Sequence, residues 1–413
     1  MTESLFPEME RSFAASRCDA LRQLEAFVPA AGRYARHRNH VVAGHTNVSR
    51  LSPAIRHRLL LESECASAPL RRYAPSTIEK FTQEVYWRRY WKSWLSLRPQ
   101  VWTDYLGELE LIRSDASQSE VIARADRCEA GESSVAIMNH FARELVETGY
   151  LHNHARMWFA GWWIHVERLP WQLGAEFFHR HLLDGDPASN TLSWRWVAGL
   201  QTPGKTYLPR RSNLEKYLPP ELLAEHSEGL GQLDKPSALK LPVPQRPAIT
   251  RKSLPASLPI RAVRTGIWLH EEDLFIEESP LSEAGACCLL ATGDPSSWHR
   301  YPASKVSWLK AAMSDGAKRA GESLRVPVEL KLDKPLIETL AGWAKEHRLE
   351  QIVAMRPEVG PLNDQMPSLE RRLKEVDVTL HLVDRPEDLE IRPLATAGFF
   401  VFWKKMQKRL GEP

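Results

Sequence analysis

The spacing of apolar residues changes once along this 413-residue chain, and the change limits the folds open to it. No convincing strand pattern precedes residue 255, and four early segments carry helical spacing: 8–30, 77–97, 135–168 and 171–183. Later, strand-like runs alternate with helical segments, which is typical of a parallel α/β sheet. The strand-like runs are 262–269, 286–291, 327–331, 351–355 and 378–383, and the helical segments are 303–321, 335–347 and 366–375. We therefore expect a multidomain protein, with an all-α domain over residues 1–218 and a Rossmann-like parallel α/β domain over residues 260–413.

A proline-rich segment separates the two halves. Residues 219–259 are polar, show little periodicity and contain Pro219, Pro220, Pro236, Pro242, Pro244, Pro247, Pro255 and Pro259. Proline fixes the backbone and interrupts regular structure, so this composition predicts a linker that is semi-rigid where prolines cluster.

Composition excludes several classes of site. Lys plus Arg number 55 and Asp plus Glu 52, so the net charge of +3 gives little reason to expect a polyanionic partner, and any basic surface must be local. Basic runs such as Arg56-His57-Arg58 and Lys205–Arg211 fit such a patch or simply a solvated face. The five cysteines form no CxxC pair, which argues against zinc, an iron–sulfur cluster or a disulfide framework. We expect a cytoplasmic monomer without a metal, a signal peptide or a membrane span.

Two polar segments of the first half stand out by their residue order. They are Thr148–Met157, which reads TGYLHNHARM, and Leu183–Asn190, which reads LDGDPASN and is followed by Trp194-Arg195-Trp196. Together they resemble the flavin-binding core of the photolyase/cryptochrome family, in which a TGW-x-HN-x-x-RM segment and a DGD-x-x-x-N-x-x-x-W-x-W segment wrap a U-shaped FAD. The resemblance runs back to Ser49-Arg50-Leu51-Ser52-Pro53 and covers roughly residues 20–217. It implies an all-α FAD-binding domain.

The second half is similar to the α/β antenna domain of the same family. Ile267–Leu274 resembles its opening WFRRDLRL turn, although His270-Glu271-Glu272 replaces the double arginine, and Ile352–Pro361 and Thr396–Met406 resemble later segments. In ordinary members this domain comes first, so the order here suggests a circular permutation. Permutation is physically reasonable because termini and linkers lie at surfaces. A doubly wound domain with another role is the alternative.

The resemblance implies a set of flavin contacts. Ser49, Arg50, Leu51 and Ser52 would form the phosphate loop at the start of a helix, although Val48 replaces the family's first hydroxyl and Thr46 or Asn47 could substitute for it. Arg156 would lie beside the flavin and pair with Asp184, Asp186 would lie at the pyrimidine edge, and Asn190 would lie near N5. The remaining implied contacts are Tyr34, Arg88 and Asn153.

A second set of residues matches the lesion pocket of pyrimidine-dimer photolyases. Glu84, Trp87, Arg88 and Trp91 share one helix face, a pattern that ordinary core packing also produces. An acid among aromatics is costly in a plain core, however, because a buried carboxylate needs a partner. The resemblance assigns Glu84, Trp87, Asn153, Met157 and Trp196 to the pocket. The pair His152-Asn153 differs from the His-His pair of enzymes that repair the (6-4) lesion.

Electron transfer to the flavin is the third implied function. Trp194 and Trp171 match the first two tryptophans of the family's relay, but Gln118 stands at the third position. Another aromatic must then complete the path, with Trp158, Trp162 and Trp163 as candidates, although core packing also explains these three.

The sequence therefore predicts a light-driven, FAD-dependent lyase that repairs cyclobutane pyrimidine dimers in damaged DNA. The alternatives are a cryptochrome-like blue-light photoreceptor without repair activity and a flavoprotein subunit that has lost both roles. A second, antenna chromophore is possible, but the sequence does not identify it.

Overall fold

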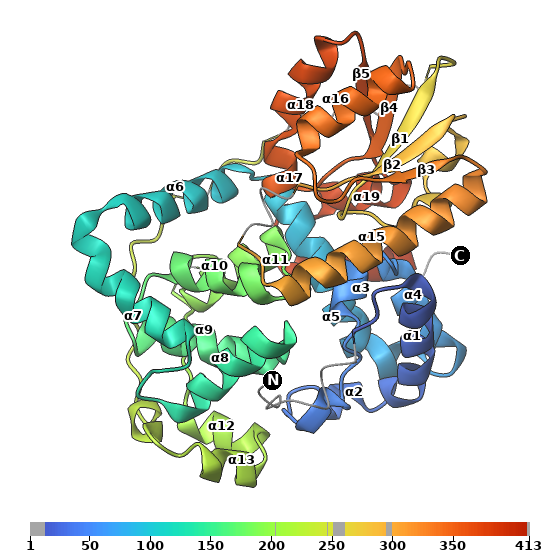
Figure 1. Cartoon of the computed structure of the whole chain (residues 1–413). Coiled ribbons are helices and arrows are strands. Elements are labelled where there is room, and N and C mark those ends of the chain that lie inside the picture. Colours follow the sequence, from blue (N-terminus) through green and yellow to red (C-terminus); the bar gives the residue numbers. More distant parts are fainter. Residues whose placement is uncertain (1–12, 203, 246, 251–260, 295–299, 411–413) are drawn as a thin grey trace, which may run out of the picture.

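The computed structural model describes residues 13–202, 204–245, 247–250, 261–294 and 300–410, and it has a helical part followed by a five-stranded sheet (Figure 1). The helices of the first part are α1 Arg17–Ala31, α2 Tyr34–His37, α3 Ser52–Arg56, α4 Glu62–Ser67, α5 Pro75–Ser96, α6 Gln100–Ser114, α7 Ser119–Glu129, α8 Ala136–Thr148, α9 Asn153–His165, α10 Trp171–His181, α11 Pro187–Val197, α12 Arg211–Tyr217 and α13 Pro220–Glu225. The described residues of this part contain no strand, as predicted.

The sheet is parallel throughout and has the strand order β3-β2-β1-β4-β5. Its strands are β1 Thr265–Leu269, β2 Cys288–Ala291, β3 Val328–Leu330, β4 Gln351–Met355 and β5 Thr379–Val383. Ile267 on β1 lies opposite Leu289 on β2 and Val353 on β4. All five predicted strands are confirmed, with ends within three residues of those expected, and the fold class is the predicted one.

Helices cover both faces of the sheet. They are α15 Ala303–Leu324 on one face and α16 Leu336–Glu346, α17 Pro361–Asp364 and α18 Met366–Lys374 on the other. The last two helices, α19 Pro386–Ile391 and α20 Phe399–Leu410, pack instead in the core of the helical part. Ile267 and Leu269 point toward α15, and this core continues into α1, α3 and the first turns of α5. Trp268, on the opposite face, packs with α16 and α18. The helix α15 thus lies between the sheet and the helical part (Figure 1).

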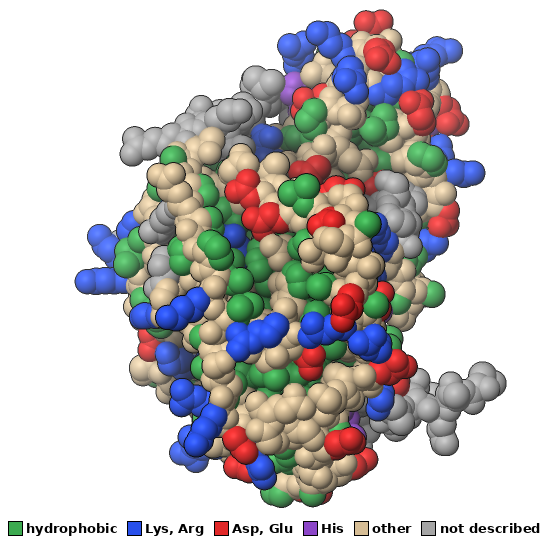
Figure 2. Space-filling view, turned by 90° about the vertical axis from the view of Figure 1, so that its left-hand side faces the viewer, with side chains coloured by type: hydrophobic (Ala, Val, Ile, Leu, Met, Phe, Trp, Pro, Cys, Tyr) green, Lys and Arg blue, Asp and Glu red, His purple; other side chains and the backbone are tan. Residues whose placement is uncertain are grey.

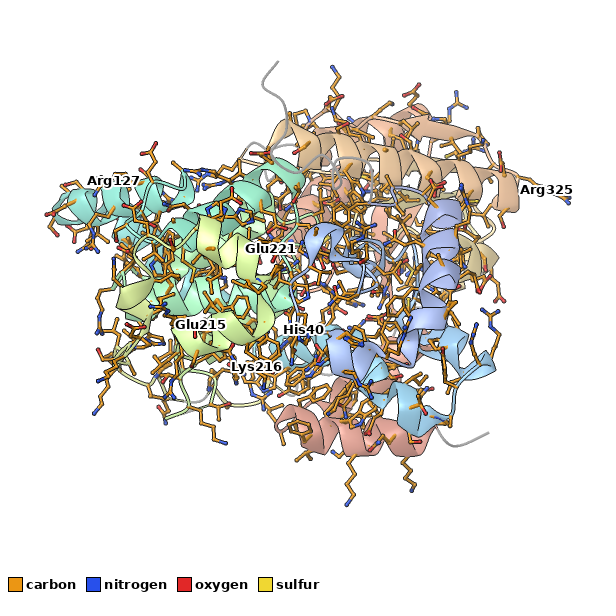
Figure 3. The ribbon with its side chains drawn as sticks, turned by 90° about the horizontal axis from the view of Figure 1, so that it is seen from below. His40, Arg127, Glu215, Lys216, Glu221 and Arg325 are labelled. Atoms are coloured by element: carbon orange, nitrogen blue, oxygen red, sulfur yellow. The ribbon has the colours of Figure 1, made fainter. Side chains whose placement is uncertain are left out.

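Local signals explain where the key helices begin and end. The carboxylate of Asp186 accepts the backbone N–H of Ser189 at 2.7 Å, and Pro187 follows it, so α11 starts with an N-cap and a proline in its first turn. Gly149 ends α8 in the left-handed region with φ 68°. The chain after α2 closes against α12, where the Val41 N–H donates to the Tyr217 carbonyl at 3.0 Å; Figure 3 shows His40 beside Glu215 and Lys216.

The proline-rich segment packs against the helical part over much of its described length. Leu230 and Leu233 are buried in the core of the helical part. The Leu239 N–H donates to Nδ1 of His165 at 3.2 Å. The Thr250 N–H donates to the Leu97 carbonyl at 2.9 Å. The predicted domain boundaries stay predictions, and the part at 251–259 lies outside the described residues.

Buried ion pairs join the two domains. Arg56 of α3 holds Glu272 with two hydrogen bonds of 2.9 and 2.5 Å, and Lys92 of α5 lies 3.7 Å from the same carboxylate. Arg58 pairs with Asp273 at 2.9 Å and with Asp388 at 2.7 Å. Glu272, one of the residues that replace the family's double arginine, thus pairs with two cations of the helical domain, Arg56 and Lys92. Their positive charges compensate the negative charge of the acidic turn.

None of the described helices combines the length and the apolar character that crossing a lipid bilayer requires.

Candidate flavin and substrate site

The helices α5, α9 and α11 each keep one partly exposed face inside a closely packed core. Along α9 every residue is buried except Asn153, Arg156 and Met157, which share one face. On α5 the face with Glu84, Trp87, Arg88 and Trp91 is only partly buried, while the flanking Val85, Tyr86, Arg89 and Tyr90 are buried. Asn190 and Trp196 are partly exposed on α11. All five residues of the predicted lesion pocket therefore keep contact with solvent.

Asp184 forms ion pairs with residues on the partly exposed faces of both α5 and α9. Its carboxylate lies 3.1 Å from Arg156 of α9 and 3.2 Å from Arg88 of α5, and only 4% of Asp184 is exposed. Burial alone would raise the pKa of this carboxyl, but Arg156 and Arg88 lower it to about 2. The predicted pair Arg156–Asp184 is thus present in the structure, with Arg88 as a second partner.

Asp186 lies against the domain interface. Besides capping α11, its carboxylate lies 3.4 Å from Arg56 and 3.5 Å from Lys92, and the residue is 2% exposed. Burial opposes ionisation here, but Lys92 and Arg56 hold the pKa of Asp186 well below its ordinary value. The same two cations contact Glu272, so this residue of the flavin motif is electrostatically linked to the α/β domain. Its contact with the flavin pyrimidine edge stays a prediction.

The predicted phosphate loop has a specific backbone shape. Arg50 has φ 52°, in the left-handed region, and its guanidinium donates to the Gly44 carbonyl at 3.0 Å. The hydroxyl of Ser49 accepts a hydrogen bond from the Leu51 N–H at 3.4 Å. The side-chain amide of Asn47 donates hydrogen bonds to the carbonyls of His37 and His40. The helix that follows, α3, has only five residues, so it supplies a weaker dipole than the prediction assumed.

Several buried polar atoms in these motifs lack a hydrogen-bond partner among the described residues, including Nε2 of His152. His152 is 1% exposed, and Nδ1 of its ring accepts the His154 N–H at 3.2 Å, which leaves the Nε2 side to carry the proton. Burial holds the pKa of His152 well below its ordinary value, so the ring is neutral. Unpaired buried groups of this kind are costly, and polar groups of a bound FAD would satisfy them. The residues present therefore fit that cofactor.

Other predicted flavin contacts have local roles. The ring of Tyr34 packs on Phe81 at 5.4 Å, and burial raises the pKa of its phenol. The side-chain amide of Asn190 donates to the Ala175 carbonyl of α10 at 2.7 Å, which fixes the orientation of this partly exposed group.

Glu84 and Trp87 each have a partner that the sequence reading missed. Arg38, at the end of α2, donates to the Glu84 carboxylate; burial raises the pKa of this carboxyl, and Arg38 opposes the rise. Arg38 lies four residues after Tyr34, and this helical spacing could have indicated it. Phe399 of α20 stacks on Trp87, with ring centroids 3.6 Å apart and planes 9° apart, so one face of the indole is covered. Trp196 of α11 packs on Tyr207, with ring centroids 5.9 Å apart.

The tryptophans proposed to complete the relay are wrongly placed for that role. Trp158, Trp162 and Trp163 are all 0% exposed, so none can receive an electron directly from solvent. They fill the core around α9, which was the alternative explanation. Trp194 and Trp171 are 2% and 3% exposed, as inner members of a path would be.

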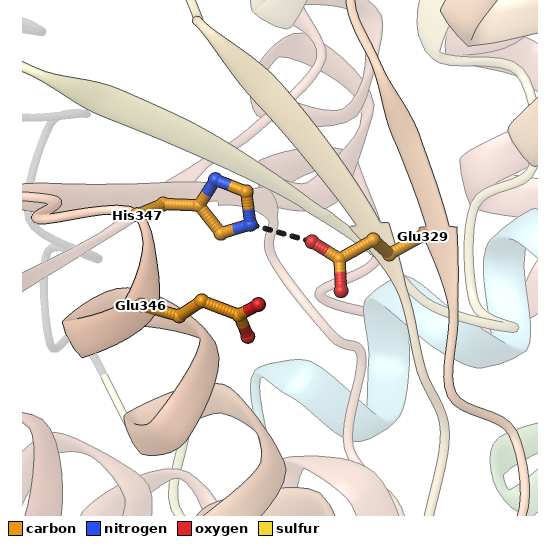
Figure 4. A group of neighbouring side chains, drawn as sticks. All are labelled: Glu329, Glu346 and His347. Carbon is orange, nitrogen blue, oxygen red and sulfur yellow. Dashed lines mark hydrogen bonds and ion pairs between the residues drawn. The ribbon is translucent and has the colours of Figure 1, made fainter.

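A group of acidic and histidine side chains on the α/β domain, Glu329, Glu346 and His347, lies at the edge strand β3 (Figure 4). The His347 ring contacts Glu329 at 2.6 Å, and Lys331 lies 2.7 Å from Glu329 and 3.6 Å from Glu346. Because Lys331 pairs with the carboxylates of both Glu329 and Glu346, we interpret this group as a surface network of ion pairs.

A small cavity of about 20 Å³ lies between the domains and is lined by Arg56, His179, Glu271, Tyr301 and Lys305, among others. This volume suits a single water molecule. In this arrangement the cavity gives no room for a second chromophore.

Known proteins resemble the helical domain most clearly. Residues 81–217 match the family described as the FAD binding domain of DNA photolyase. A deoxyribodipyrimidine photo-lyase of Streptomyces griseus is 33% identical over 125 residues, which is 30% of this chain and 26% of that relative. A cryptochrome DASH of Idiomarina loihiensis is 33% identical over 87 residues, which is 21% of this chain and 19% of that relative.

The crystal structure of a bacterial class III photolyase from Agrobacterium tumefaciens aligns with 56% of this chain and 54% of its own, at 20% identity and a TM-score of 0.43. The photo-lyase relative from Streptomyces griseus is matched over only about a quarter of its own length. The circular permutation stays a prediction. The match over residues 81–217 contains most of α5 and all of α9 and α11, with the polar faces described above. Residues 81–217 are therefore an FAD-binding domain of the type found in the photolyase/cryptochrome family.

Proposed function

We propose that this protein is a light-driven, FAD-dependent lyase that splits cyclobutane pyrimidine dimers in DNA. The observation that carries the proposal is the group of five partly exposed residues, Glu84, Trp87, Asn153, Met157 and Trp196, all of the type that pyrimidine-dimer photolyases use. They lie on α5, α9 and α11, and the ion pairs of Asp184 with Arg88 and Arg156 join α5 to α9. A lesion that leaves the base stack could enter such a site, as enzymes acting on bases require.

The chain's own residues would bind and orient the lesion. The partly exposed indole of Trp87 would stack on one base, with Phe399 packed against one of its faces. Glu84, held in place by Arg38, would contact the lesion bases with its carboxyl group. FAD, when bound, supplies light absorption and the transferred electron. Arg88 and Arg156 would hold the flavin side of the site through Asp184.

The direct test is photorepair. Protein loaded with FAD and reduced with dithionite is expected to restore a thymine-dimer oligonucleotide under blue light and to leave it unchanged in the dark. Repair is measured by chromatography of the oligonucleotide. If illuminated, reduced protein binds damaged and undamaged DNA equally and repairs neither, the repair proposal is refuted.

A cryptochrome-like photoreceptor is the second candidate. One observation favours it: Phe399 covers one face of Trp87, which narrows the space for a stacked lesion. Under this candidate the FAD-loaded protein responds to blue light but does not repair DNA.

Trp87→Ala is expected to lower affinity for the damaged oligonucleotide by about 1–3 kcal/mol, because a base–aromatic stack is lost. Trp87→Phe should keep most of the affinity. Trp91→Ala is the matched control, since Trp91 lies one turn further along the same face of α5 and is not assigned to the pocket. Fluorescence anisotropy of labelled DNA measures all three, and equal losses in Trp87→Ala and Trp91→Ala would contradict the assignment.

A further inference from the structure

The path from the flavin motif to the surface begins at Trp194, whose indole packs closely against α10. A Cβ atom added to Gly174 would come within 2.3 Å of the Trp194 ring, so the glycine permits this close approach. Trp171 lies one helical turn before Gly174, and the guanidinium of Arg195 lies 6.0 Å from its ring centroid. Trp194 therefore contacts α10 one turn from Trp171.

An aromatic pair on α6 continues the path beyond Trp171. Tyr105 stacks on Trp171, with centroids 5.4 Å apart and planes 29° apart. Trp102 follows, with its centroid 5.5 Å from that of Tyr105. Both are nearly buried, at 4% and 5% exposure. Gln118, at the expected third position, lies instead in the turn between α6 and α7.

The end of this path has a proton acceptor. Nε1 of Trp102 donates to the carboxylate of Asp364 at 2.8 Å; Asp364 lies on α17 of the α/β domain, and this hydrogen bond is partly buried. Loss of an electron makes an indole N–H strongly acidic, so a carboxylate at this distance can take its proton. Partial burial raises the pKa of Asp364, with the Trp102 N–H opposing the rise, so the carboxylate is a better base than an ordinary aspartate.

Tyr105 is suited to bridge the two tryptophans. Burial strongly raises the pKa of its phenol, and the adjacent Glu176 adds to the rise. A tyrosine gives up an electron readily only when its proton can leave. Trp102, by contrast, can be oxidised first and lose its proton to Asp364 afterwards.

We propose that Trp102 is the outer electron donor of the light-driven relay and that Asp364 receives its indole proton. This inference rests on the FAD photochemistry of the proposed function. With FAD bound, Trp194 would donate one electron to the light-excited flavin, and Trp171 would then reduce the oxidised Trp194. Trp102 would then donate an electron to the oxidised Trp171 by way of Tyr105, and its N–H proton would pass to Asp364. A soluble thiol then returns one electron to Trp102, which recovers the proton from Asp364, and the oxidised thiol goes on to disulfide.

The proposal assigns a role to domain docking. Trp102 belongs to the helical domain and Asp364 to the α/β domain, so the donor and its proton acceptor meet only when the domains are packed together. The loop before α17 is closely seated, because a Cβ at Gly360 would come within 2.7 Å of Pro187. The side of the molecule formed by α6 and α7 carries mixed basic and acidic side chains (Figure 2), so a small thiol of either charge can approach.

The test follows photoreduction of oxidised, FAD-loaded protein with a thiol present. Trp102→Phe is expected to lose most of the photoreduction rate. Asp364→Asn should keep the first electron transfer but lose the deprotonated tryptophan radical, which time-resolved absorption and electron paramagnetic resonance distinguish from the protonated radical. Trp343→Phe and Glu329→Gln are matched controls, because Trp343 donates to Glu329 at 3.0 Å away from this path. Both controls should behave as the unchanged protein.

Chemical reduction separates this proposal from the function itself. After dithionite treatment, Trp102→Phe and Asp364→Asn should bind FAD and repair DNA like the unchanged protein, since the relay is bypassed. Equal photoreduction and equal radical decay in all variants would overturn the relay. Failure of the dithionite-reduced, unchanged protein to repair DNA would instead overturn the proposed function.

Discussion

Replacing Asp184 with alanine is expected to weaken FAD binding by roughly 3–5 kcal/mol, which is about two to four orders of magnitude in Kd. The reason is that Arg156 and Arg88, 3.1 and 3.2 Å from its carboxylate, would be left without a counter-charge in a site where Asp184 is 4% exposed. Titration of flavin fluorescence measures the Kd. Arg156→Ala should show a smaller loss in the same direction, because Arg88 still pairs with Asp184.

An exposed ion pair provides the control for this prediction. Glu215 pairs with Arg211 on α12 with both side chains more than 40% exposed, and Glu215→Ala should change FAD affinity little. Circular dichroism separates loss of the cofactor from loss of the fold. Full retention of FAD by Asp184→Ala would remove the basis for placing the flavin beside this residue.

The pH dependence of Asp184 follows from its lowered pKa. Because the folded value is about 2 and the ordinary value 3.8, its contribution to stability is complete above pH 3.8 and is lost as pH falls toward 2. The ion pairs with Arg156 and Arg88 should thus survive mild acid. In Asp184→Asn this part of the acid dependence should disappear, as acid titrations of FAD retention would show.

Glu272→Ala is expected to lower the free energy of unfolding by roughly 3–5 kcal/mol. The change would leave Arg56 and Lys92, each 4% exposed, with Asp186 as their remaining shared carboxylate. Burial opposes ionisation of Glu272, but Arg56 and Lys92 lower its pKa, so this contribution is present near neutral pH and fades as pH falls below its ordinary value of 4.5. Urea unfolding measures the loss.

The control for Glu272 is Glu338, which pairs with Arg372 at 2.9 Å while 65% of its side chain is exposed. Glu338→Ala should cost at most about 1 kcal/mol. A similar cost for both variants would contradict the view that buried charges hold the domains together. If unfolding of Glu272→Ala separates into two transitions, the interface is the element that was weakened.

Much of the fold could be predicted from the sequence because the signals are local. Apolar spacing indicated α5, α8 to α10 and all five strands, since periodicity depends only on which face each residue presents. The helix α11 was not predicted, because its first residues are polar and small; its N-cap at Asp186 was the available signal. The family resemblance implied that Arg156 pairs with Asp184, and the structure contains this ion pair.

The two-part fold class and the resemblance to the family's flavin motif could be recognised from the sequence alone, because both depend on residues that lie close together along the chain. Only the tertiary structure decided which partners complete the site. Arg38 on Glu84, Phe399 on Trp87 and Asp364 on Trp102 come from distant segments, the last two across the domain interface. The same holds for Glu272, an acid that looked like a departure from the family until the packing placed Arg56 and Lys92 beside it. Charge matching and ring stacking depend on separations in space of a few ångströms, and these are set only when the helical domain and the sheet pack together.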